Sequence, residues 1–138
     1  MKKVILILFL LILVVSTTGC LSAIKGQKIT IYKQLGDESN FEDFREVNNR
    51  KEVKEAIRIV KSADWHQSEI EITRTADYLF QFPSKNDRKN KIASYSLWVH
   101  SENEFLEIVT DTDEYVQLSN EDSASLYRIL IGGELTSE

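Results

Sequence analysis

Hydrophobic and polar residues alternate along this chain with periods that change several times, and each period predicts a secondary-structure element. Residues 28–34 alternate and predict a first strand, and residues 41–47 predict a short second one. From residue 50 to about residue 63, apolar positions recur at helical spacing after Asn49, which with Glu52 has the spacing of a capping box. The buried stripe predicted for this helix consists of Val53, Ala56, Ile57, Val60 and Ala63.

Between residues 70 and 119 the period is two. Strands are predicted around Ile70 and Ile72 and over residues 78–82, 92–100, 105–110 and 115–118. Ser119 then precedes a last amphipathic helix that Gly132 ends. Because the loops are short and polar, the strands are expected to pair antiparallel. The expected fold class is α+β: an antiparallel sheet of about five strands with two helices packed on one face, one after the first strand or two and one C-terminal.

The first twenty residues follow a different plan. Two lysines precede an apolar run over residues 4–15, and small residues lead to Gly19 and Cys20. This resembles the signal of a bacterial lipoprotein, although Thr17 stands where that signal usually has Leu. The resemblance implies diacylglycerol on the Cys20 sulfur and cleavage after Gly19. The chain then divides into a signal peptide (1–19), a lipidated cysteine with a short tether (20–27) and one α+β domain (28–138).

An uncleaved membrane anchor is the alternative, because residues 4–24 approach the roughly 20 residues that a spanning helix needs. The strongly apolar part ends at Val15, and that length favours a signal peptide. Both interpretations place the C-terminal domain at the cell membrane, on its extracytoplasmic side.

Composition narrows the possible partners. The 118 residues after Cys20 contain 15 basic and 22 acidic residues, a net charge of −7. An acidic domain is a poor candidate for binding nucleic acid or anionic lipid headgroups. Cys20 is the only cysteine, so no intrachain disulfide is possible. One basic cluster lies among Asn and Asp residues and predicts a solvated loop: Lys85, Arg88, Lys89 and Lys91.

Few residues suggest chemistry. Asp111, Asp113 and Glu114 offer oxygen ligands for calcium, but no glycine or distal glutamate follows as an EF-hand needs. A hairpin turn, in which Asp and Thr are common, is therefore favoured over weak calcium binding. His66 and His100 are the only histidines and are too few for a zinc site, so they are expected to be solvated or locally hydrogen-bonded. The sequence contains no G-x-S-x-G or H-E-x-x-H motif. No catalytic residue, metal or cofactor is therefore predicted.

Two tryptophans are the binding candidates. Trp98 alternates with Leu97 and Val99 and so points to the other face of its strand. If the helices cover the Leu97 face, Trp98 and Trp65 could lie at the surface, where aromatic side chains anchor partners. The alternative is that Trp98 fills a second small core.

The strands also carry a resemblance. Residues 77–80 (DYLF), residues 95–99 (YSLWV) and residues 115–119 (YVQLS, running into the last helix) resemble the small YhfM-type lipoproteins of Bacillus and relatives. That family has no known activity, so the resemblance implies a fold and a location only. The expected function is a lipid-anchored, non-catalytic binding module that meets an unknown protein or cell-wall partner. The alternative is a small extracytoplasmic hydrolase or metal-dependent enzyme whose site is assembled from scattered residues.

Overall fold

The computed structural model describes residues 28–36, 39–67, 73–82 and 93–136. The predicted signal and tether, the strand predicted around Ile70 and Ile72, and the basic cluster at residues 85–91 lie outside these ranges. None of the helices in the described ranges is long and apolar enough to cross a membrane.

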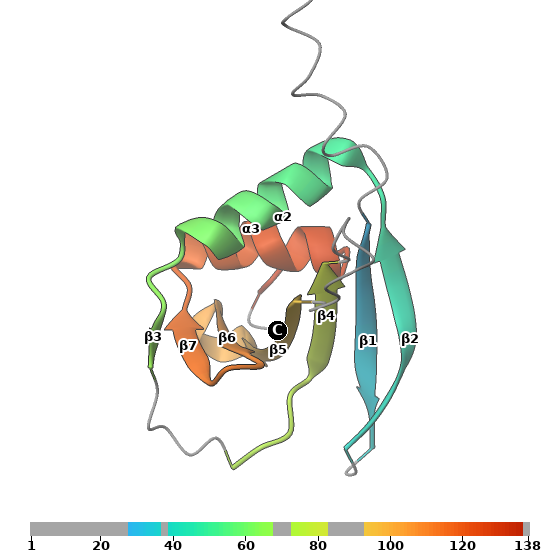
Figure 1. The fold of residues 1–138 in the computed structure, drawn as a ribbon, viewed down its shortest axis with the longest axis vertical. Helices are drawn as coiled ribbons and strands as arrows, with labels where there is room; N and C mark the ends of the chain where they lie inside the picture. The colour runs from blue at the N-terminus through green and yellow to red at the C-terminus, as the bar shows by residue number, and fades with distance from the viewer. Residues whose placement is uncertain (1–27, 37–38, 68–72, 83–92, 137–138) are drawn as a thin grey trace, which may run out of the picture.

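A seven-stranded antiparallel sheet forms the base of the fold (Figure 1). Its strand order is β2-β1-β4-β5-β6-β7-β3. The strands are β1 (Ile29–Leu35), β2 (Asn40–Val47), β3 (His66–Gln67), β4 (Tyr78–Phe82), β5 (Ala93–His100), β6 (Phe105–Thr110) and β7 (Glu114–Gln117). A short 3-10 helix, η2 (Ser101–Asn103), joins β5 to β6. The sheet has seven strands where about five were expected. The short second strand that the pattern predicted is present as the edge strand β2, and the two-residue β3, which the pattern did not predict, extends the other edge.

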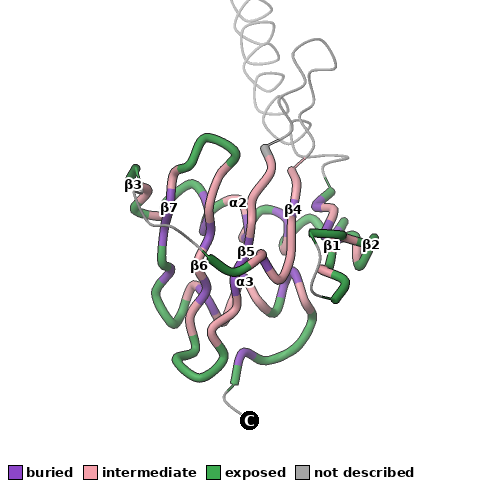
Figure 2. Tube along the Cα trace, turned by 90° about the horizontal axis from the view of Figure 1, so that it is seen from below, coloured by how far each residue is buried: buried purple, intermediate pink, exposed green. Residues whose placement is uncertain are grey.

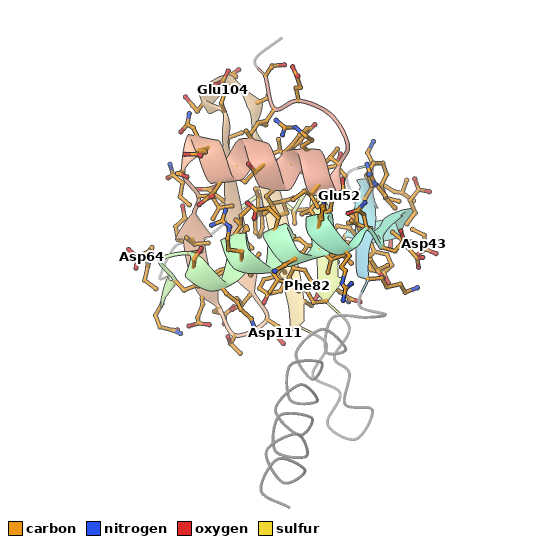
Figure 3. The ribbon with its side chains drawn as sticks, turned by 90° about the horizontal axis from the view of Figure 1, so that it is seen from above. Asp43, Glu52, Asp64, Phe82, Glu104 and Asp111 are labelled. Atoms are coloured by element: carbon orange, nitrogen blue, oxygen red, sulfur yellow. The ribbon has the colours of Figure 1, made fainter. Side chains whose placement is uncertain are left out.

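Two helices cover one face of this sheet, as the hydrophobic pattern predicts: α2 (Arg50–Ser62) and α3 (Asn120–Leu130). Figure 3 shows them side by side, and Arg58 of α2 forms an ion pair with Asp122 of α3 at 3.3 Å. The Asn49 side chain accepts hydrogen bonds from the first turn of α2, and Ser119 does the same for α3. Both predicted N-caps are therefore confirmed.

The buried stripe of α2 differs from the predicted one. Ile59 is fully buried, whereas Ile57 and Ala63 are only partly buried against the core. Ile59 lies one helical turn from Glu55 and next to Arg58, on the flank that faces α3. Because α3 lies beside α2, a wider face of α2 is buried than contact with the sheet alone would bury.

The main core lies between the helices and the sheet, and Phe80, Leu97 and Ile108 are fully buried there. Figure 2 shows that buried positions concentrate in the inner strands, while much of β2 at the edge is exposed. Residues 73–77 lead into β4 on the side of the sheet opposite to the helices (Figure 1), where they cover Trp98.

Candidate functional site

Trp98 lies on the face of the sheet opposite to the helices, beneath the segment 73–77. Its side chain is held in place because its Nε1 donates a hydrogen bond to the Arg74 carbonyl oxygen at 2.8 Å. The Asp77 carboxylate fastens the same segment, since it accepts hydrogen bonds from Arg74 Nη1 at 2.6 Å and from the Val99 amide at 2.7 Å. Trp98 is 8% exposed, and neighbouring Ala76 is buried too. Its burial favours the interpretation that Trp98 fills a second small core.

The Trp65 side chain caps the C-terminal end of α2. Its Nε1 donates to the Val60 carbonyl oxygen at 2.7 Å, which satisfies one of the carbonyls that a helix end leaves without a partner. The indole is partly buried against the core and lies 6.1 Å from the ring of Tyr95. Both indole N–H groups are thus used inside the fold. Binding of a partner by either tryptophan stays a prediction, and burial makes Trp98 the weaker candidate.

A polar cluster that the sequence does not reveal joins three strands on the same face as Trp98. Glu107 of β6 accepts a hydrogen bond from the Tyr115 hydroxyl of β7 at 2.6 Å. Its other carboxylate oxygen lies 2.5 Å from Nε2 of His100 on β5. The His100 ring stacks on Phe105 at 4.6 Å, and the His66 ring meets Tyr115 edge-on at 5.3 Å. Glu107 therefore cross-links the three strands through side chains.

Electrostatics of this cluster follow from burial. The pKa of Tyr115 is raised to about 12, mainly because burial disfavours the charged phenolate. The hydrogen bond to Glu107 and the negative charge of that carboxylate raise it further. The prediction of a locally hydrogen-bonded histidine is confirmed for His100. His66 is exposed, and its Nδ1 lies 3.2 Å from the Asp64 carbonyl oxygen.

The acidic loop at residues 111–114 folds as a turn. The Thr110 hydroxyl accepts hydrogen bonds from the amides of Thr112 and Glu114, and Asp113 adopts a left-handed backbone with φ of 61°. Asp tolerates this conformation better than most residues, which explains its place there. Within the described ranges, no three His, Cys, Asp or Glu side chains are arranged to hold a metal ion.

A hollow lies where β1, β4, β5 and α3 meet, near the C-terminal end of β1. Its volume is about 410 Å³. Its lining combines an ammonium, an amide, a carboxylate and three hydroxyls with one aliphatic side chain: Lys33, Gln34, Asp77, Tyr78, Val99, Ser101 and Tyr127. Burial, with the nearby Tyr127 and Asp77 adding to it, raises the pKa of Tyr78. We call this feature the hairpin hollow, because β1 of the β1–β2 hairpin lines it through Lys33 and Gln34.

Apolar side chains border the hairpin hollow. Among the described residues, Leu35 and Phe44 are the large hydrophobic side chains that remain exposed, at 46% and 39%. The Phe44 ring lies 5.5 Å from the ring of Tyr78, and the Lys33 ammonium lies 5.8 Å from the Phe44 centroid. Phe44 also lines a second hollow of about 540 Å³ along β2. The contact between Phe44 and Tyr78 therefore links a residue that lines one hollow to a residue that lines the other.

A bulge puts Phe44 in this position. Ile31 pairs with Arg45, whereas the next residue, Tyr32, pairs with Asp43, so Phe44 has no partner across the ladder. Bulges re-aim side chains in this way, frequently near functional sites. Phe41 and Phe44 are three residues apart, and this spacing breaks the alternation expected of a strand. That break is the signal in the sequence from which the bulge could have been suspected.

Comparison with known proteins identifies the family of this chain. The family model described as YhfM protein matches residues 24–132. No curated protein and no solved structure matches the chain. The match covers well over half of the 138 residues and includes every described strand and both helices. The chain therefore belongs to the YhfM family.

Proposed function

We propose that this protein is a lipoprotein anchored through Cys20 on the extracytoplasmic side of the cell membrane, and that its domain binds a partner without catalysing a reaction. The anchor is supported by Lys2 and Lys3, by the apolar run over residues 4–15 and by the pair Gly19 and Cys20. The family match begins at residue 24, just after this segment, as expected for a leader followed by a domain. Two or more acyl chains on the mature cysteine would make the attachment stable.

The binding role is carried by one observation: the exposed Phe44 at the rim of the hairpin hollow. Exposed apolar side chains around a polar hollow are typical of surfaces that receive a partner. The Phe44 ring lies tilted against the Tyr78 ring and near the Lys33 ammonium, so a partner that covers it would also meet a phenol and an ammonium. An aromatic anchor with polar neighbours is the usual composition of a binding hot spot.

The anchor is tested by replacing its cysteine. Cys20→Ala should remove the lipid mass from the mature protein and leave it as an unprocessed precursor or release it from the membrane. Equal membrane retention and equal mature mass in the two forms would disprove the lipoprotein assignment.

The binding surface is tested by photo-crosslinking in intact cells. A photoreactive phenylalanine at position 44 should give discrete adducts, while the same group at position 41 should give few. Phe41 is the matched control because it is a phenylalanine of the same strand that lines neither hollow. Identical adduct patterns from the two positions would remove Phe44 as the anchor.

A small hydrolase is the second candidate, and the His100–Glu107 pair favours it. A carboxylate on one ring nitrogen orients an imidazole so that its other nitrogen can accept a proton. His100 and Glu107 remain about one-third and one-quarter accessible, at 33% and 23%. If they act in this way, Glu107→Gln should abolish hydrolysis of simple ester and amide substrates by the purified protein. Equal rates for Glu107→Gln and the unaltered protein would exclude this role for the pair.

A further inference from the structure

Apart from Ser62 at its end, the exposed residues of α2 are all basic. Five exposed residues lie within one side of the helix: Arg50, Lys51, Lys54, Arg58 and Lys61. The spacing of three and four residues between Lys51, Lys54, Arg58 and Lys61 places their side chains along one stripe. The two acids of the helix, Glu52 and Glu55, lie at its flanks. The Glu55 side chain is 43% accessible and pairs with Arg58 at 2.7 Å, and Arg58 also pairs with Asp122, so the lysines carry most of the free positive charge of this face. We call the five basic residues the α2 stripe.

This stripe stands out against the charge of the domain. The helix has five basic and two acidic residues, a net +3, whereas the whole chain after Cys20 has 15 basic and 22 acidic residues. The remainder of that segment therefore carries a net −10. The overall charge argued against anionic partners, but this average hides a locally basic surface among the described residues. A surface of this kind attracts an anionic partner and orients the molecule toward it.

The position of the α2 stripe relative to the proposed lipid anchor suggests which anionic partner it binds. The chain enters the sheet at Ile29, which pairs with Val47 at the end of β2, and α2 begins three residues later at Arg50. In Figure 1 the start of β1 accordingly lies at the end of the molecule where α2 begins. Seven residues separate Cys20 from Lys28, a reach of at most about 25 Å. The 13-residue helix is about 20 Å long, so the whole stripe lies within reach of the surface that holds the anchor.

We propose that the α2 stripe docks on anionic lipid headgroups of the membrane to which the protein is anchored; this inference rests on the lipid anchor proposed above. Each Lys or Arg close to an anionic bilayer contributes about 1 kcal/mol. The tether keeps the local concentration of headgroups high, so weak contacts are enough to hold the domain in one orientation. Lys33 and the hairpin hollow lie toward the opposite end of β1 and would then point away from the membrane, toward a partner.

The test uses the mature lipidated protein, purified from membranes and reconstituted into vesicles. Lysines are labelled with an amine-reactive reagent in neutral phosphatidylcholine vesicles and in vesicles that contain phosphatidylglycerol. Labelling of Lys51, Lys54 and Lys61 should fall at least about threefold in the anionic vesicles, as expected for contacts of about 1 kcal/mol each. Labelling of Lys33 should not change. The protection should disappear in high salt, because screening shortens the range of the attraction.

A charge-reversal variant tests the same surface with a second readout. Energy transfer from the tryptophans to a dansyl headgroup should be higher in anionic than in neutral vesicles. The difference should be lost in the variant Lys51→Glu, Lys54→Glu, Lys61→Glu. The control variant Lys85→Glu, Lys89→Glu, Lys91→Glu changes the net charge equally and should keep the difference. Equal loss in both variants would attribute the effect to net charge and overturn the proposal.

The remaining outcomes separate the two proposals. If the protein sediments with neither kind of vesicle and lacks the lipid mass, the anchor itself is wrong. If it sediments with both but the α2 lysines are labelled equally, the anchor stands and the docking proposal fails. Protection of the same lysines by soluble polyphosphate, without protection by anionic vesicles, would overturn docking on the membrane in favour of a polyanionic polymer.

Discussion

Replacing Ser123 by alanine tests the one polar residue that the described core buries completely. Its hydroxyl accepts a hydrogen bond from the Leu106 amide at 2.9 Å and lies 3.4 Å from the Leu118 carbonyl oxygen, to which it can donate. The alanine variant leaves the Leu106 N–H buried without a partner, which costs about 1–3 kcal/mol. Alanine regains about 0.5 kcal/mol of helix propensity. The free energy of unfolding should therefore fall by about 0.5–2.5 kcal/mol.

Urea unfolding, followed by circular dichroism and by tryptophan fluorescence, measures this change. Ser125→Ala is the matched control, because Ser125 lies in the same helix, is only partly buried and makes no side-chain hydrogen bond to another described residue. Its stability should stay within about 0.5 kcal/mol of the unaltered protein. Equal unfolding midpoints for the two variants would show that the Ser123 hydroxyl does not hold α3 to the sheet.

Three further predictions concern the core, the polar cluster and the end of α3. Ile59→Ala should cost about 2–5 kcal/mol in urea unfolding, and Ile57→Ala clearly less; equal losses would refute the buried face of α2. Because the pKa of Tyr115 is raised from 10.0 to about 12, stability present below pH 10 should be lost as pH rises from 10 to 12. Tyr115→Phe should remove about 2–3 kcal/mol of that alkaline loss, and an unchanged pH profile would contradict the assignment. Gly132→Ala should lower the melting temperature, since Gly132 has φ of 91° and a Cβ would meet the Arg45 guanidinium at 2.0 Å.

Local pattern was sufficient for most secondary structure. The alternation around Leu97 and the helical spacing around Val53 predicted a strand and a helix that the structure contains. The caps at Asn49 and Ser119 were readable because a cap depends on residues three positions apart in the chain. The stripe of α2 was predicted less well, because α3 buries Ile59 and the sequence does not say where α3 lies.

The sites needed the tertiary structure. Glu107 bonds to His100 and Tyr115, seven and eight residues away, only because antiparallel pairing brings β5, β6 and β7 side by side. Trp98 is buried by the segment at Arg74, 24 residues earlier, and periodicity carries no information about such a contact.

By itself, then, the sequence determined most of the strands, both described helices, the fold class and the expectation of a membrane anchor, since each depends on residues close together in the chain. The positive face of α2 was also readable from its spacing, but its place beside the entry of the chain depends on the register of Ile29 with Val47. The hairpin hollow brings together side chains of three strands and a helix, with Phe44 turned outward by a bulge. Register, bulge and hollow were decided by long-range packing, because each exists only once distant segments meet.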